Sequence, residues 1–136
     1  MPVAGGEVTS EYGQRTHPTT GKAHTMHHGV DIAALEGTPV IAVDGGTIEQ
    51  RNNPGGYGQY VLQRTPGGQR LIMGHLSRYH GVSGQQVSPG DTVGYVGSTG
   101  RSNGPHLHFE VRIGVGWGTS IRHDSMYPRL NLYPRR

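Results

Sequence analysis

Two short clusters of histidines and carboxylates stand out among the nine histidines of this 136-residue sequence. The first is the segment 27–31 (HHGVD), and the second is the segment 106–110 (HLHFE). Imidazole nitrogens and carboxylate oxygens bind Zn²⁺, and the same groups are the side chains that most often move protons in catalysis. The sequence therefore indicates metal-dependent or acid–base chemistry.

The first cluster carries two candidate ligands four residues apart. Because residues i, i+2 and i+4 share one face of a β-strand, we expect His27, Gly29 and Asp31 to point the same way and His28 to point away from them. We also expect Gly29 to leave open space in front of the backbone. No ligand role is assigned to His28.

The second cluster follows the same alternation. It predicts that His106, His108 and Glu110 share one strand face, while Leu107 and Phe109 turn into the core. Two imidazoles about 7 Å apart on one strand face can lie on either side of a small reactive centre.

Together the clusters supply the ligand set of a hydrolytic zinc site. Such a site takes three nitrogen or oxygen ligands and keeps one position for water, whose pKa falls to about 7. His27, Asp31 and one histidine of the second cluster provide three ligands without any cysteine. The HExxH motif of helical zinc proteases is absent. Spacing alone leaves one alternative, in which these residues are solvent-exposed histidines on sheet faces.

The rest of the sequence predicts a β-sheet scaffold for these clusters. It contains 24 glycines and 9 prolines, and each glycine inside a helix costs about 1 kcal/mol relative to alanine. Apolar or alternating segments are instead short and separated by turns, at 38–43, 47–51, 59–64, 70–73, 92–96 and 107–113. We therefore predict an all-β fold, a compact antiparallel sheet or sandwich with long glycine-rich loops at 52–58 and 97–105.

Composition restricts the class of protein further. The chain has no cysteine, no apolar run of membrane-spanning length, and no signal-peptide pattern at residues 1–10. The net charge of +3 suits an acidic partner such as nucleic acid or a bacterial wall polymer. Nucleic-acid binding is not expected, because aromatic residues are only 7% and the arginines are scattered rather than arranged in a stripe.

The order of motifs across residues 9–113 resembles the lysostaphin- and LytM-type zinc endopeptidases of bacterial cell walls. The matching segments are 10–15 (SEYGQR), 27–34 (HHGVDIAA), 37–40 (GTPV), 56–58 (GYG), 75–77 (HLS) and 104–110 (GPHLHFE). The resemblance implies a compact antiparallel β domain with an open groove whose floor carries zinc. It also implies that residues 1–136 form one peptidase domain, with a family-like core at 9–113 and a chain-specific segment at 114–136.

The resemblance assigns a role to five residues. It implies that His27, Asp31 and His108 bind Zn²⁺, and that His75 and His106 flank the metal-bound water as the catalytic pair. Which of that pair is the general base stays open. Glu110 is a candidate for fixing the tautomer of His108, or it is an ordinary polar residue on a half-exposed strand. We expect the other histidines, at 17, 24, 80 and 123, at the surface or in loops.

The implied activity is zinc-dependent hydrolysis of the peptide cross-links of peptidoglycan, with no membrane insertion. The segment 15–22 (RTHPTTGK) resembles Gram-negative D,D-endopeptidases, which favours the bond between D-Ala and meso-diaminopimelate. The alternative is a catalytically inactive member that binds wall peptides or acts as a scaffold. Action at the bacterial cell wall without a signal peptide predicts a phage lysin, a virion component or an excised domain.

Overall fold

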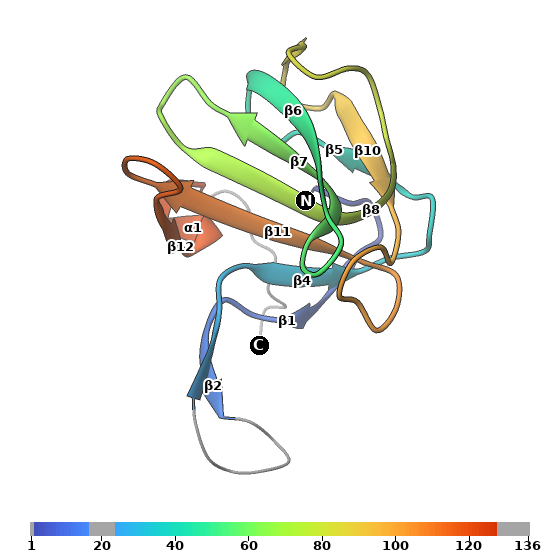
Figure 1. The fold of residues 1–136 in the computed structure, drawn as a ribbon, viewed down its shortest axis with the longest axis vertical. Coiled ribbons are helices and arrows are strands. Elements are labelled where there is room, and N and C mark those ends of the chain that lie inside the picture. Colours follow the sequence, from blue (N-terminus) through green and yellow to red (C-terminus); the bar gives the residue numbers. More distant parts are fainter. Residues whose placement is uncertain (1, 17–23, 128–136) are drawn as a thin grey trace.

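The computed structural model describes residues 2–16 and 24–127, which form twelve strands and one short helix (Figure 1). In chain order the elements are β1 (Glu7–Ser10), β2 (Gly13–Thr16), β3 (His24–His27), β4 (Val30–Ala33), β5 (Pro39–Ile41), β6 (Gly46–Asn53), β7 (Gly58–Arg64), β8 (Arg70–Tyr79), β9 (Gln86–Val87), β10 (Thr92–Val96), β11 (His106–Ile113), β12 (Thr119–Ile121) and α1 (His123–Met126).

Ten of the strands belong to one antiparallel sheet. Its main path runs β1-β4-β11-β8-β7-β6-β9, while β10 pairs with β5 and β8, and β12 pairs with β11. Strands β2 and β3 form a separate two-stranded ribbon that extends away from this sheet (Figure 1). The predicted all-β antiparallel fold is confirmed.

Most of the strands predicted from alternation form where expected. Strand β10 has the predicted bounds 92–96, and β7 and β11 each begin one residue before the predicted segment. Strand β8 is longer than predicted, because it continues from the predicted end at residue 73 to Tyr79. The segment 75–77 is therefore part of a central strand rather than of a loop.

The main apolar core lies against the three central strands β4, β11 and β8. Their almost fully buried core side chains are Val30, Ile32, Leu71, Met73, Leu76, Leu107, Phe109 and Val111. Burying an aliphatic or aromatic side chain of this size contributes about 1.5–3 kcal/mol. This packing fixes the three strands side by side, and so it positions the polar residues on their opposite face.

The expectation that residues 27–31 form one regular strand is wrong. Strand β3 ends at His27, a bend follows at Gly29, and β4 begins at Val30. Strand β3 pairs with β2, whereas β4 pairs with β1 and β11. The chain thus changes sheets between the two candidate ligands, and the bend rather than strand parity brings His27 beside Asp31.

The C-terminal part of the described chain returns to the sheet. His123 is 3% exposed on the single turn of α1, so its predicted surface position is wrong, whereas His80 is exposed as expected. His17 and the side chain of His24 lie outside the described residues. Within residues 2–16 and 24–127, no helix is long and apolar enough to span a membrane.

Candidate active site

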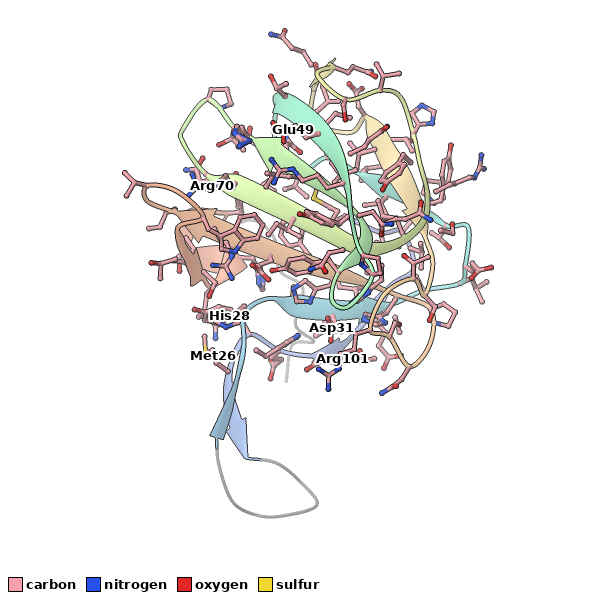
Figure 2. All side chains as sticks on the ribbon, viewed as in Figure 1. Met26, His28, Asp31, Glu49, Arg70 and Arg101 are labelled. Atoms are coloured by element: carbon pink, nitrogen blue, oxygen red, sulfur yellow. The ribbon has the colours of Figure 1, made fainter. Side chains whose placement is uncertain are left out.

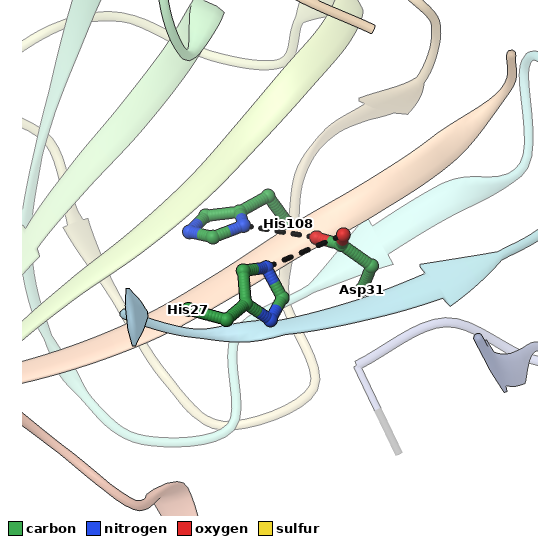
Figure 3. Close-up of side chains that lie close together, drawn as sticks. All are labelled: His27, Asp31 and His108. Carbon is green, nitrogen blue, oxygen red and sulfur yellow. Dashed lines mark hydrogen bonds and ion pairs between the residues drawn. The ribbon is translucent and has the colours of Figure 1, made fainter. Parts of the chain in front are cut away.

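The three residues predicted to bind metal meet at one point on the polar face of the sheet (Figure 3). His27 Nε2 lies 3.3 Å from Asp31 Oδ2, and His108 Nδ1 lies 2.9 Å from Asp31 Oδ1. One donor atom from each residue lies within 4.8 Å of the others. An ion placed between them could bind two imidazoles and one carboxylate.

Strand pairing explains why two of these residues meet. In the register of β4 and β11, Asp31 lies directly opposite His108, and side chains of directly opposed residues are about 5 Å apart at Cβ. His27, the third residue, is the last residue of β3. Its ring is fixed by the main-chain oxygen of Glu11, which lies 2.9 Å from His27 Nδ1. Because a carbonyl oxygen only accepts, Nδ1 donates to it, and Nε2 is the ring nitrogen that faces the site.

The two predicted catalytic histidines lie side by side next to this cluster. The ring centroids of His75 and His106 are 4.7 Å apart, and His106 Nε2 lies 3.8 Å from Asp31 Oδ1. Nδ1 of each ring contacts a main-chain oxygen, that of Thr99 at 2.7 Å and that of Gly104 at 2.8 Å. Both rings therefore keep Nε2 available for proton transfer.

A β-bulge places His75 in this position. Between Met73 and Leu76, strand β8 contains one more residue than its partner β7, and the register shifts there. His75 has a φ of +63°, the only positive φ of a non-glycine residue in the described chain, and its N–H donates to Tyr57 O at 2.6 Å. A bulge turns a side chain that regular alternation would direct elsewhere. The bulge lets Met73 and Leu76 both pack in the core while His75 lies at the site.

The pKa values of three groups respond to this packing. Burial would raise the pKa of the Asp31 carboxyl, but hydrogen bonds with His108 and His27 hold it well below its ordinary value. Burial lowers the pKa of the His75 imidazole. Burial would also lower the pKa of His108, yet its hydrogen bonds with Asp31 and Glu110 raise it to about 9. At neutral pH, the carboxyl group of Asp31 is thus ionised and the ring of His75 is neutral.

The predicted open groove is present above these residues, with a volume of about 790 Å³. Its floor contains the side chains of Asp31 and of the four histidines of the site, and its walls include Tyr57 and residues 101–105 of the glycine-rich loop 97–105. Arg101 is exposed on the wall formed by this segment, on the same side of the molecule as Asp31 (Figure 2). A substrate can therefore reach the floor from solvent.

Comparison with known proteins shows the family to which this chain is related. Residues 25–124, which include all five site residues, match peptidase family M23. The chain is 43% identical over 114 residues to the DD-carboxypeptidase/endopeptidase Mpg of Neisseria meningitidis, covering 82% of this chain and 26% of the relative. It is 37% identical over 100 residues to the peptidoglycan DD-endopeptidase ShyC of Vibrio cholerae, covering 74% of this chain and 23% of the relative.

The chain belongs to peptidase family M23. Its structure is also similar to that of the catalytic domain of the antimicrobial peptidase lysostaphin from Staphylococcus simulans. The TM-score is 0.77 at 30% sequence identity, with 91% of this chain and 92% of that domain covered. The resemblance to lysostaphin-type peptidases is thereby confirmed. The chain spans about a quarter of the length of the two curated relatives.

Several residues that shape this M23 site were not identified from the sequence. The main-chain oxygens of Glu11, Thr99 and Gly104 hold imidazoles, and no residue type marks a main-chain contact in advance. Arg112, which contacts Glu110, was also missed. The candidate contact of Glu110 with His108 is present, with Glu110 Oε1 2.8 Å from His108 Nε2.

Gly29 has a different role from the one expected. The space beside it is filled, because a Cβ at this position would lie 2.5 Å from Phe109 O and 2.8 Å from His108 Nε2. We expect Gly29→Ala to destabilise the fold by about 1–3 kcal/mol, a typical cost of overpacking, and to weaken metal binding because the ring of His108 must move. Thermal unfolding and metal titration measure the two effects.

Gly55→Ala is the matched control for this prediction. No heavy atom lies within 4 Å of the position that a Cβ would take at Gly55, so we expect wild-type stability and metal affinity. Wild-type values for Gly29→Ala would contradict the close packing of His108 against this bend.

Proposed function

We propose that the chain is a zinc-dependent endopeptidase that hydrolyses peptide cross-links of bacterial peptidoglycan. The observation that carries the proposal is the convergence of His27, Asp31 and His108 on the floor of an open groove, beside the pair His75 and His106. The convergence of all five side chains supports an active enzyme over an inactive wall-binding member. The names of the relatives that act on peptidoglycan support the choice of substrate.

The donor set fits zinc. Two imidazoles and one carboxylate are the ligands found in catalytic zinc sites, where three protein ligands leave a position for water. Nε2 of His27 and Nδ1 of His108 both face the Asp31 carboxylate, and Asp31 is ionised at neutral pH because its pKa is lowered. Zinc bound there would polarise the scissile carbonyl and lower the pKa of a bound water.

The protein's own groups would then handle the protons. The neutral ring of one of the two histidines, His75 or His106, accepts a proton from the attacking water, and the other histidine donates a proton to the leaving amine. Their main-chain contacts at Nδ1 hold both rings in place, so that Nε2 of each ring faces the groove. A protonated imidazole also stabilises the negative charge that develops on the carbonyl oxygen.

We propose the bond between D-Ala and meso-diaminopimelate as the one cleaved. The names of two relatives describe DD-endopeptidases. A cross-link with free carboxylates also suits the exposed Arg101 at the groove, since guanidinium groups pair with carboxylates. The other argument from sequence, the segment 15–22, falls mostly on residues 17–23, which lie outside the described part of the chain.

The test is digestion of two purified cell walls by the zinc-loaded protein. One wall is cross-linked directly through diaminopimelate and the other through pentaglycine, and the released muropeptides are separated and identified by mass spectrometry. We expect dimers of the first wall to become monomers while the second wall stays intact. Cleavage of pentaglycine alone would overturn the bond assignment, and cleavage of neither wall would overturn the proposed function.

A further inference from the structure

The imidazoles at the site are held in two different ways. Three of the four rings are fixed at Nδ1 by main-chain carbonyl oxygens, and these are the rings of His27, His75 and His106. His108 is reversed. It directs Nδ1 at Asp31, and its Nε2 lies 2.8 Å from a side-chain oxygen of Glu110. His108 is therefore the ring at this site whose two nitrogens both face side-chain carboxylates.

The strand register accounts for the reversal. Because His108 lies directly opposite Asp31 across the β4–β11 pair, the near nitrogen Nδ1 already reaches the carboxylate. The far nitrogen Nε2 extends past it, toward the next residue on the same face of β11, which is Glu110. Residues i and i+2 of a strand share a face, so the backbone itself places this carboxylate beside the ring.

Glu110 is built into the protein as a charged acceptor. Its side chain is 1% exposed, and both of its oxygens lie 2.9 Å from the hydroxyl of Tyr57. Arg112 donates to it from Nε and also donates from Nη1 to Gly118 O at 3.2 Å. A buried carboxylate requires such partners, because burying an isolated charge is strongly unfavourable. An ionised Glu110 only accepts hydrogen bonds, so Nε2 of His108 carries a proton, and a metal ion at the site would replace the proton that Nδ1 shares with Asp31.

We propose that Glu110 is a positioning residue that holds His108 in the tautomer and ring orientation that present the Nδ1 lone pair to the metal. Arg112 keeps the carboxylate charged and in place, and Tyr57 covers it. The inference rests on the proposed zinc site formed by His27, Asp31 and His108. Groups that hold a ligating imidazole from behind typically change metal affinity about 10- to 100-fold when they are lost.

The main test compares zinc affinity in wild type and in the double variant Glu110→Met with Arg112→Met. Removing both charges avoids an unpaired buried arginine, and methionine roughly preserves the volume of glutamate. Affinity is measured by competition with a chromophoric chelator. We expect zinc binding about 10- to 100-fold weaker than that of wild type.

A second readout follows the ring itself. In the zinc-loaded wild type, we expect NMR to show a slowly exchanging, downfield Nε2–H proton of His108, and we expect this resonance to be lost in the double variant. The single variant Glu110→Gln keeps an oxygen that can accept from Nε2–H, so it should retain the resonance and bind zinc with intermediate affinity. If the double variant fails to fold, the zinc affinity and the Nε2–H resonance of Glu110→Gln are compared with those of wild type instead.

The matched control is the pair Glu49 and Arg51. It also joins residues i and i+2 of one strand, with Arg51 Nε 3.0 Å from Glu49 Oε2, but it is only partly buried on β6 and well separated from Asp31 (Figure 2). Glu49→Met with Arg51→Met should leave zinc affinity unchanged.

Two results would overturn the inference. Wild-type zinc affinity in the double variant, together with a retained Nε2–H resonance, would mean that Glu110 serves only as a partner for Arg112. A wild-type protein that binds no zinc would overturn the proposed metal site, and this inference with it.

Discussion

Asp31→Ala is expected to lose zinc and hydrolytic activity together. Asp31 is the carboxylate that both imidazoles of the donor set face, at 3.3 Å from His27 and 2.9 Å from His108. Its removal takes away the only negative charge among the three ligands and leaves two imidazoles without their common partner. We expect zinc affinity to fall by more than the roughly 100-fold that loss of a group behind a ligand costs. Metal analysis after dialysis and release of soluble muropeptides measure the two losses.

His28→Ala is the control for this prediction. His28 adjoins His27, but its side chain is exposed and its Nδ1 lies 2.7 Å from Ser120 Oγ, away from the donor cluster. We expect this variant to keep full zinc content and activity. Full zinc in Asp31→Ala, or loss of zinc in His28→Ala, would contradict the ligand assignment.

The second large effect should separate catalysis from metal binding. We expect His106→Ala to keep its zinc and to lose activity by about 10²- to 10⁴-fold, the usual contribution of a positioned acid–base group. His106 is placed for this role by its contact with Gly104 O and by the neighbouring ring of His75. Hydrolysis rates are compared at equal zinc occupancy.

The corresponding change at His75 needs a different substitution. Its φ of +63° strains most side chains, whereas asparagine tolerates this left-handed region. His75→Asn should therefore fold and retain zinc, while losing activity to a similar extent. Wild-type activity in either the His75 or the His106 variant would remove that residue from the catalytic pair.

Local alternation in the sequence was sufficient to predict much of the scaffold. Strand β11 formed as expected because Leu107 and Phe109 fill the core at every second position, and this leaves His106 and His108 on the opposite face. The antiparallel all-β fold followed from the frequency of glycine and from short alternating segments. These features are local, so they can be recognised without knowing the tertiary structure.

The rest of the site depends on contacts between distant segments. The bend at Gly29 packs against Phe109 O and the ring of His108, which lies 79 residues later in the chain. The bulge at His75 depends on how β8 pairs with β7. The burial of His123 depends on the return of the C-terminal segment to the sheet. The residue types near these positions do not predict such contacts. The role of His75 was therefore assigned only from the resemblance to a family.

The measurement that tests the metal site most directly is an anomalous difference map at the zinc absorption edge, from crystals of the zinc-loaded protein. We predict one strong peak within about 2.0–2.2 Å of His27 Nε2, an Asp31 carboxylate oxygen and His108 Nδ1, the bond lengths usual for zinc. A peak held by other side chains, or no peak at these three atoms in the zinc-loaded protein, would contradict the assignment of the site.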